Sequence, residues 1–326
     1  MRAAWWERPG PARDVLVLGE MPTPSPGPGE VLVRVATSGV NPSDVKSRAG
    51  RASVFPRVIP HSDGAGVVEA VGEGVPAARV GERVWLWNGA WKRAFGTAAD
   101  YIALPAIQAV PLPENTGFEA GACFGIPALT ALHAALCDGG VSGQAVLVQG
   151  GAGAVGHYAI QFARLLGARM VLTTVSGTAK AAHALAAGAD AAINYREEDV
   201  AERVRALTGG RGVERVIELD LAANAATLPA LLAPGGMVAV YGSGKPEASL
   251  SFFPNIIAGI GYRFFIVYEL NAADRARAVG ALNAWAGAGL LRHAVAARLP
   301  LAEIAAAHEA VEAGTLMGNM VVDIPA

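Results

Sequence analysis

The sequence predicts an α/β protein made of a β-rich lobe and a doubly wound parallel sheet. The 326 residues are 52% hydrophobic and 17% charged, against roughly 25% charged in an average soluble domain, so the chain can bury a large core. Up to about residue 120, short apolar runs are separated by glycine, proline and asparagine, which is typical of strands joined by turns. From about residue 145, apolar strands alternate with helices of about ten residues, which indicates βαβ units.

The first lobe is expected to consist mainly of strands. A proline-rich connector over residues 22–29 leads into the partly alternating run VLVRVATSGV, which predicts a strand. Further short strands are expected at residues 66–71, 83–87 and 101–104, between segments rich in turn-forming residues.

The second lobe is expected to supply the parallel sheet. Strands are predicted at residues 145–149, 170–174, 191–194, 213–219, 237–241 and 264–267. Helices are predicted at residues 155–166, 179–187, 198–207 and 225–232. Helices 274–288 and 301–313 and a strand at 320–323 are expected to return to the first lobe. We therefore expect residues 1–122 and 269–326 to form one domain and residues 123–268 the other.

Composition excludes several classes of protein. With 26 Lys+Arg and 28 Asp+Glu, the net charge of −2 is unlike the strongly basic surface of a nucleic-acid-binding protein. Two cysteines exclude a disulfide framework and a four-cysteine zinc site. Glu7 interrupts the start of the chain, and Pro127 and His133 interrupt the long uncharged run 120–137. We therefore expect neither a secretory leader nor a membrane span, and a cytoplasmic protein.

A glycine motif predicts a dinucleotide site. Gly151, Gly153 and Gly156 follow the apolar strand at 145–149 and open a helix, with the spacing G-x-G-x-x-G. In that setting the glycines allow a tight turn, close approach of a pyrophosphate to the backbone, and close packing of helix on strand. The start of the helix supplies N–H donors and the positive end of its dipole.

The residues after the second strand of this sheet favour NADP(H). Proteins that bind NAD usually place an acid about 20 residues after the glycine turn, yet no Asp or Glu occurs from Gly139 to Ala189. We predict that Ser176, Lys180 and Tyr195 hold the 2′-phosphate and adenine. The alternative is an ordinary loop hydroxyl and a solvated lysine.

Several blocks in order resemble the medium-chain dehydrogenase/reductase superfamily, specifically its zinc-free quinone oxidoreductase branch. They include GVNPSDVKSRAG (39–50), HSDGAGVVEAVGEGV (61–75), LLAPGGMVAVYGS (231–243) and AHEAVEAGTLMGNMVV (307–322). The resemblance implies a GroES-like first lobe, a Rossmann second lobe and an active site between them. It also implies NADPH-dependent reduction of quinones or activated alkenes by a homodimer or homotetramer.

The resemblance also assigns residues to the cofactor. The pyrophosphate loop falls on Ala152, Gly153, Ala154, Val155 and Gly156. The 2′-phosphate region falls on Ser176, Lys180 and Tyr195, as above. The nicotinamide side falls on Tyr241, Gly242, Ser243 and the segment Phe265–Val267, with Asn41 and Thr130 nearby.

Zinc is not expected. The positions that hold catalytic zinc in the alcohol dehydrogenase branch correspond to Asn41, Ser62 and Ile126, none of which is a good zinc ligand. His61 is adjacent, and we interpret it as a hydrogen-bonded residue. Without a metal, polarisation of a carbonyl must come from hydrogen bonds, which favours quinones and α,β-unsaturated carbonyls.

Candidate hydrogen-bond donors lie in the NPSD block. The Asn41 amide could donate to substrate or fix its own loop, and Ser43 occupies the place of a proton-relay hydroxyl in the zinc enzymes. Asp44 is expected to be structural, with Arg48 as a local partner. Lys46 replaces a tyrosine of many relatives and could favour a polar acceptor.

Other side chains are weaker candidates for substrate contact. Trp87 could stack on a quinone ring or pack in the core, and Arg93 could be a cleft cation or a surface charge. Cys123 is interpreted as a buried apolar residue. Three alternatives to quinone reduction stay open, namely a 2-alkenal or enoyl reductase, a non-catalytic crystallin-like NADPH-binding protein, and a zinc alcohol dehydrogenase.

Overall fold

The computed structural model describes residues 1–50 and 53–325. The chain forms two compact units, residues 1–127 with 283–326 and residues 128–282. The α/β class with a β-rich unit and a parallel sheet is confirmed. None of the helices in the described part of the chain combines the length and the apolarity needed to cross a bilayer.

The first unit is built on a seven-stranded sheet. Its strands run in the order β14-β15-β3-β4-β5-β7, and β6 pairs with β3. All pairs are antiparallel except β14 with β15. The bounds are β3 Glu30–Val40, β4 Asp63–Val71, β5 Arg83–Leu86, β6 Tyr101–Pro105, β7 Ala109–Pro111, β14 Val295–Pro300 and β15 Asn319–Asp323. A separate antiparallel pair joins β1 (Arg2–Trp5) and β2 (Val17–Glu20).

Two apolar clusters support this sheet. Alternate residues of β3, such as Val31, Val33 and Val35, pack with side chains of β4 to β6 in one cluster. The other cluster packs Val45 and Ile304 with side chains of β1, β14 and β15 and with Val40 at the end of β3. The helices of the unit are α1 (Ala12–Val15), α2 (Pro42–Gly50), α3 (Phe118–Gly121) and α12 (Ile304–Glu312), and a π-helical turn spans Phe124–Ala128.

The second unit is a six-stranded parallel sheet in the order β10-β9-β8-β11-β12-β13. The strands are β8 Ala145–Val148, β9 Met170–Val175, β10 Ala191–Asn194, β11 Val213–Glu218, β12 Leu232–Val240 and β13 Gly261–Phe264. In chain order this is 3-2-1-4-5-6, the doubly wound arrangement. The winding reverses between β8 and β11, and ligands bind such sheets outside the carboxyl ends of the strands at that point.

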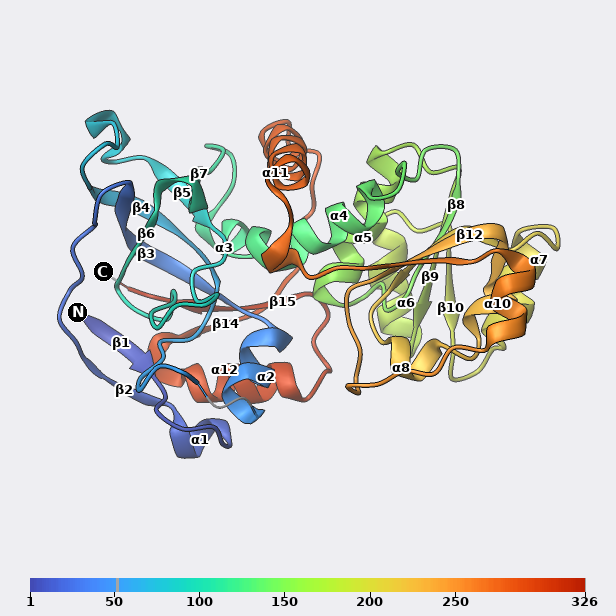
Figure 1. Ribbon diagram of the computed structural model, residues 1–326, viewed down its shortest axis with the longest axis horizontal. Coiled ribbons are helices and arrows are strands. Elements are labelled where there is room, and N and C mark those ends of the chain that lie inside the picture. The colour runs from blue at the N-terminus through green and yellow to red at the C-terminus, as the bar shows by residue number, and fades with distance from the viewer. Residues whose placement is uncertain (51–52, 326) are drawn as a thin grey trace. The chain divides into compact units, whose positions relative to one another are not determined.

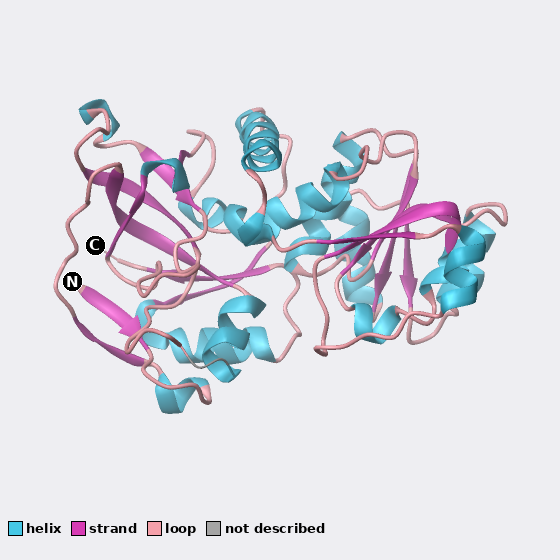
Figure 2. Ribbon diagram, in the orientation of Figure 1, coloured by secondary structure: helices cyan, strands magenta, loops and turns pink. Residues whose placement is uncertain are grey.

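Helices cover both faces of this sheet, as Figures 1 and 2 show. The helices are α4 Leu129–Leu136, α5 Ala154–Leu165, α6 Thr178–Ala186, α7 Val200–Leu207, α8 Leu221–Asn224, α9 Leu228–Leu231 and α10 Phe252–Ala258. A further helix, α11 (Ala272–Gly287), contains the boundary between the two units at residues 282 and 283. Side chains of α7, α8 and α9 bury the apolar residues of one face. Packing of α4 on α5 belongs to the other face.

Several predicted bounds were wrong. The strand expected at residues 264–267 is β13, which ends at Phe264. The helix expected at 225–232 is the shorter α9, Leu228–Leu231, because α8 has already ended at Asn224, Pro229 lies in the first turn of α9 and Leu232 already belongs to β12. Strands β1, β2 and β14 were not predicted, and neither was α2, which contains most of the NPSD block.

Candidate functional site

The glycine turn joins β8 to α5 in the geometry that a pyrophosphate needs. A Cβ at Gly151 would lie 2.8 Å from the Ile160 Cδ1 atom, and a Cβ at Gly156 would lie 2.8 Å from both the Gly150 carbonyl carbon and the Gly151 Cα. Gly153 is the N-cap of α5, and within the described residues no side chain caps this end of the helix. The first N–H groups of α5 are therefore left for a ligand, and these residues fit a dinucleotide.

The residues predicted for the 2′-phosphate gather at the carboxyl ends of β9 and β10. Ser176 directly follows β9, and Lys180 lies in the first turn of α6. The Tyr195 N–H donates to the Val175 carbonyl over 3.1 Å, which places Tyr195 beside the end of β9. Arg196, an exposed cation that our reading of the sequence missed, comes next and could have been found from its place after Tyr195.

The next two strands end with a buried acid and the predicted nicotinamide-side residues. Glu218, the last residue of β11, accepts from the Asp220 N–H at 2.6 Å and from the Asn224 amide at 2.9 Å. Burial raises its pKa, and its Oε2 has no partner among the described residues. The Tyr241 N–H donates to the Glu218 carbonyl over 3.1 Å, and the Gly242 carbonyl accepts from the Leu221 N–H over 3.1 Å.

Predicted cofactor residues of this unit therefore lie along one edge of the sheet. The glycine turn, Ser176, Tyr195 and Tyr241 each follow the carboxyl end of a parallel strand. Ser243 continues the last of these segments, and its hydroxyl donates to the Lys245 carbonyl. Two further predicted residues, Phe265 and Val267, follow β13, with the Phe265 N–H donating to the Val240 carbonyl over 3.1 Å.

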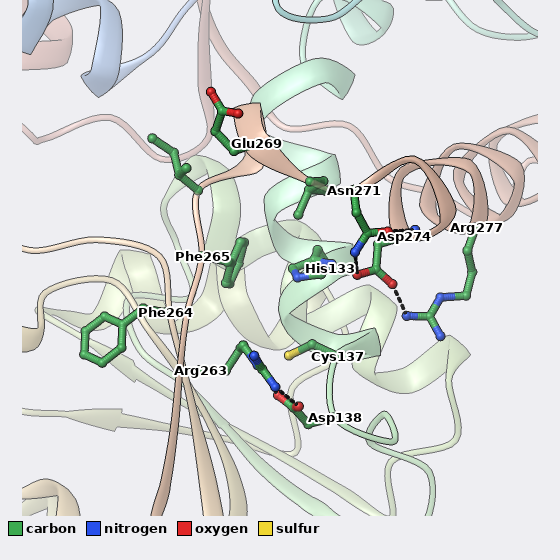
Figure 3. A pocket seen from close by; sticks show the side chains of 12 residues that line it. His133, Cys137, Asp138, Arg263, Phe264, Phe265, Glu269, Asn271, Asp274 and Arg277 are labelled. Carbon is green, nitrogen blue, oxygen red and sulfur yellow. Dashed lines mark hydrogen bonds and ion pairs between the residues drawn. The ribbon is translucent and has the colours of Figure 1, made fainter.

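A hollow of about 480 Å³ lies beside the edge strand β13 (Figure 3). Phe265 meets the ring of His133 edge-on at 4.6 Å between centroids. The surrounding charges are already paired, because Arg263 contacts Asp138 at 2.6 Å and Arg277 contacts Asp274 at 3.0 Å. The hollow therefore offers a substrate few uncommitted groups, and we do not assign it as the substrate site.

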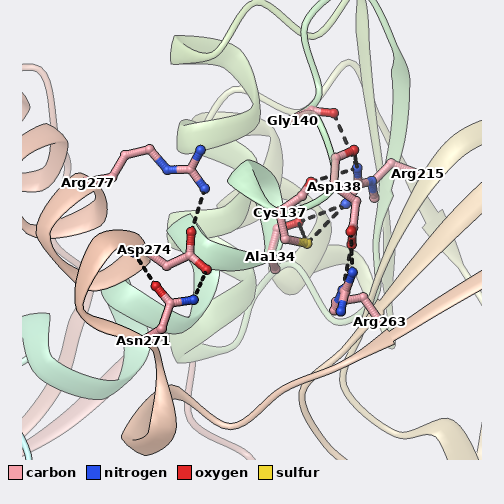
Figure 4. Close-up of polar contacts among 9 residues, drawn as sticks. All are labelled: Ala134, Cys137, Asp138, Gly140, Arg215, Arg263, Asn271, Asp274 and Arg277. Atoms are coloured by element: carbon pink, nitrogen blue, oxygen red, sulfur yellow. Dashed lines mark hydrogen bonds and ion pairs between the residues drawn. The ribbon is translucent and has the colours of Figure 1, made fainter.

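A buried arginine holds the C-terminal end of α4 (Figure 4). The Arg215 side chain of β11 donates to the carbonyls of Cys137, Asp138 and Gly140 over 3.1, 3.3 and 3.3 Å, and to the Ala134 carbonyl over 3.4 Å. The Ala134 carbonyl belongs to the last turn of α4, whose carbonyls have no intrahelical partners, and the other three lie at the C-cap, Cys137, and in the turn that follows. The arginine thereby fixes α4, which carries the predicted cofactor residue Thr130 near its start.

In the first unit, Asn41 caps α2 and is held by two acids. The Asp44 carboxylate accepts from the Asn41 backbone N–H at 2.9 Å, which is one half of a capping box. The Asn41 side-chain amide donates to Asp63 at 2.9 Å. The expected partnership of Asp44 with Arg48 was wrong, because the Arg48 guanidinium binds the Gly10 carbonyl and Glu312. Burial raises the pKa of Asp44 to about 7.

The positions that correspond to zinc ligands meet around Asp63. Both the Asn41 amide and the Ile126 N–H, the latter at 3.0 Å, donate to Asp63 Oδ2, and Ser62 precedes Asp63 in the chain. In the described ranges, no group of three or more His, Cys, Asp or Glu side chains could hold a metal ion.

His61 is hydrogen-bonded, as expected, within a buried chain of polar groups. Its Nδ1 lies 2.8 Å from the Ser38 hydroxyl and its Nε2 lies 2.9 Å from His308 Nε2. The Ser38 hydroxyl also lies 2.7 Å from the Thr97 hydroxyl, which donates to the Asp63 carbonyl. Every bond of this chain is made when His308 donates to His61, His61 to Ser38, and Ser38 to Thr97.

Burial keeps both imidazoles of this chain neutral. It lowers the pKa of His61 well below its usual value and that of His308 to about 3. A buried pair of neutral histidines that are hydrogen-bonded to each other and to Ser38 has a structural role, although His308 Nδ1 has no partner among the described residues. In the described part of the chain, neither ring belongs to a group of three or more His, Cys, Asp or Glu side chains that could hold a metal.

The degree of burial distinguishes the remaining residues that were considered for contact with substrate. Trp87 is buried at the end of β5, which favours core packing over stacking on substrate. The Arg93 side chain donates to the Ala103 carbonyl within its own unit, and burial lowers its pKa. Ser43 is half-buried and Lys46 exposed on α2. Cys123 is buried with its pKa raised, in line with an apolar role.

Comparisons with known proteins agree with this architecture. Residues 27–114 match the alcohol dehydrogenase GroES-like domain and residues 154–282 the zinc-binding dehydrogenase family. The chain is 32% identical over 291 residues to a quinone oxidoreductase from Sus scrofa, covering 88% of this chain and 86% of the relative. It is 32% identical over 338 residues to a 2-haloacrylate reductase from Burkholderia sp, covering 98% of each. A mycobacterial protein solved with NADPH is 31% identical with a TM-score of 0.88, covering 99% of this chain and 100% of the other.

Proposed function

Because the chain belongs to the quinone oxidoreductase branch of the medium-chain dehydrogenase/reductase superfamily, we propose that it reduces quinones or related α,β-unsaturated carbonyls with NADPH. The observation that carries the proposal is the edge of the parallel sheet, where an open glycine turn stands beside Ser176, Lys180 and Tyr195 with no acid in residues 139–189. When bound there, NADPH supplies the hydride, while the chain supplies binding and orientation.

Different residues of the second unit bind the two phosphate-containing parts of NADPH. Uncapped N–H groups at the start of α5 hold the pyrophosphate, and the hydroxyl of Ser176 with the ammonium of Lys180 holds the 2′-phosphate. Arg196 adds a second positive charge at this edge, so a 2′-phosphate is favoured over the bare ribose of NADH.

Reduction is proposed to proceed without a metal. The chain has Asn41, Ser62 and Ile126 where zinc-dependent relatives have ligands, and two of these donate to Asp63 instead. Activation of the acceptor then rests on hydrogen bonds, which suffices for acceptors that are already electron-poor. Activated alkenes are the second candidate class, since the 2-haloacrylate reductase matches almost the whole chain.

Steady-state oxidation of NADPH tests the proposal directly. We expect turnover with benzoquinones, with crotonaldehyde and 2-chloroacrylate as the comparison that ranks quinones against activated alkenes. Tight NADPH binding with no turnover on any of them would instead identify a non-catalytic binding protein. Stoichiometric zinc in an elemental assay of the purified protein would identify a zinc alcohol dehydrogenase.

Replacing Ser176 and Lys180 together with alanine is expected to remove the preference for NADPH. Hydrogen bonds to a charged group contribute roughly 1.5–3 kcal/mol each, so the loss of two predicts about 100-fold weaker NADPH binding. NADH affinity should change by less than about threefold, because the bare ribose lacks the group these residues hold. The matched control is Arg211→Ala, which removes an exposed cation at the opposite ends of the strands. An unchanged ratio of the two dissociation constants would contradict this assignment.

We also propose that the protein is at least a homodimer paired through the edge strand β13. The exposed apolar side chains of α10 and β13 include Phe253, Ile257 and Phe264, with exposed fractions of 70%, 83% and 61%. β13 is the last strand of its sheet, so its outer edge can pair with the same strand of a second chain. Such pairing would also bury the exposed apolar side chains beside it.

Light scattering tests the dimer. Phe264→Lys in β13 should reduce the measured mass of the wild-type oligomer to that of a single chain, because a charge on an edge strand opposes pairing. Ile107→Lys, at an exposed apolar residue of the first unit, should leave the mass unchanged. A wild-type protein with the mass of one chain would refute the proposal.

A further inference from the structure

The side chain of Asn41 is not used in the way the capping position of a helix normally uses it. In a capping box the N-cap side chain accepts from the N–H of the third helical residue, here Asp44. Instead the Asp44 N–H donates to the backbone carbonyl of Asn41 over 3.0 Å. The side-chain amide nitrogen of Asn41 points away from the helix and donates to Asp63 at 2.9 Å. The acid that orients this amide therefore belongs to another element, the start of β4.

The surroundings of Asp63 are built to hold its carboxyl group. Asp63 is fully buried, and its Oδ2 accepts both the Asn41 amide and the Ile126 N–H. A Cβ at Gly125 would collide with Asp63 Oδ1, and a Cβ at Gly39 would lie 2.9 Å from the Asp63 Cβ, so both glycines leave room for the side chain. Oδ1 has no partner among the described residues.

An uncharged Asp63 fits this arrangement. Burial and the nearby charge of Asp44 raise the pKa of Asp63 well above its usual value. In the acid form, Oδ2 is a carbonyl oxygen that accepts two N–H bonds, and no unpaired charge is buried. An asparagine at the same place has the same shape and the same accepting oxygen.

We propose that Asp63 is a positioning residue for the reduction, which holds the Asn41 amide at a position that corresponds to a zinc ligand. The inference rests on the proposed function, in which Asn41 is a predicted hydrogen-bonding residue beside the nicotinamide and not one of the residues assigned to the phosphates of NADPH. Fixing Nδ2 fixes the plane of the amide and thereby the direction of its Oδ1. Asp63 acts only through Asn41, so it should affect the rate of turnover and not the affinity for NADPH, whose phosphates are assigned to residues 152–156 and to Ser176 and Lys180.

Four proteins test this: wild type, Asp63→Asn, Asp63→Ala and Asn41→Ala. For each we would measure kcat and KM with benzoquinone, the NADPH dissociation constant, and Tm. We expect kcat of Asp63→Asn within about threefold of wild type, and kcat of Asp63→Ala and Asn41→Ala at least about tenfold lower. NADPH affinity should stay within about twofold of wild type in all three variants. The double variant Asn41→Ala/Asp63→Ala should be no slower than Asn41→Ala, because residues that act as one unit are not additive.

Each contrary outcome overturns the inference. Wild-type kcat in Asp63→Ala excludes positioning, an Asp63→Asn variant as slow as Asp63→Ala shows that the charge is required, and an additional loss in the double variant shows a role apart from Asn41. If Asp63→Ala does not unfold cooperatively, Asn41→Ala and Asp63→Asn decide the question, and a wild-type rate in the former refutes it.

Failure of the proposed function is distinguishable from failure of this inference. A wild-type protein that turns over no substrate refutes the function, and the emission spectrum of bound NADPH then reports the positioning alone. That spectrum should shift in Asp63→Ala and Asn41→Ala but not in Asp63→Asn. An identical spectrum in all four proteins would overturn the positioning role.

Discussion

Replacing Gly156 with alanine is expected to weaken NADPH binding by at least about 100-fold, which corresponds to roughly 3 kcal/mol. The added Cβ would collide with the Gly150 carbonyl oxygen and lie 2.8 Å from the Gly150 carbonyl carbon and from the Gly151 Cα. All of these atoms belong to the backbone, so no side chain can rotate to relieve the contact. Either the glycine turn or the start of α5 must move, and both carry the N–H groups proposed for the pyrophosphate.

Quenching of protein fluorescence by NADPH measures this effect, with Gly280→Ala as the matched control. Gly280 lies within α11, and an added Cβ there meets no atom within 4 Å. Alanine in a helix interior is favoured over glycine by up to about 1 kcal/mol, so the control should bind NADPH normally and be slightly more stable. A Gly156→Ala protein with the affinity of the control would show that this turn does not hold the cofactor.

The sequence predicted the parallel sheet well where its strands are buried on both faces. All four residues of β8 are buried, so an apolar run there reports its environment directly. At the edge strand β13, apolar residues are not a reliable sign of a buried strand. The residues after it include exposed apolar ones such as Ile266, so the sequence pattern wrongly extended the strand beyond Phe264. Strand β14 was missed because alternate residues of VAARLP are exposed and its partner β15 is distant in the chain.

The candidate site divides in the same way. The positions of the glycine turn and of the residues after β9 could be predicted, since the motif is defined by neighbours in the chain. The hydrogen bonds of Asp63 could not, because its partners Asn41 and Ile126 are 22 and 63 residues away. In the sequence, His61 and Ser62 were considered only as possible zinc ligands. The signal for Asp63 that the sequence did offer was an acid directly after Ser62, a zinc-ligand position that holds no ligand here.

The second large effect is expected from Arg215→Met, which should lower the free energy of unfolding by about 3 kcal/mol. Arg215 is 1% exposed, and it serves the carbonyls of Ala134, Cys137, Asp138 and Gly140 at the end of α4. Methionine fills much of the same space but makes none of these hydrogen bonds, and a hydrogen bond from a charged group contributes roughly 1.5–3 kcal/mol. The positive charge opposite the negative end of the helix is lost as well.

Thermal unfolding of Arg215→Met should therefore show a Tm about 6–12 °C below that of the wild type, at roughly 2–4 °C for each kcal/mol. The control is Arg298→Met in β14, which removes an exposed ion pair with Asp323 of β15 and should cost less than about 1 kcal/mol. Arg215→Lys should fall between the two, because an ammonium keeps the charge but cannot span four carbonyls. Equal Tm values for Arg215→Met and Arg298→Met would mean that the end of α4 is held by its packing and not by this guanidinium.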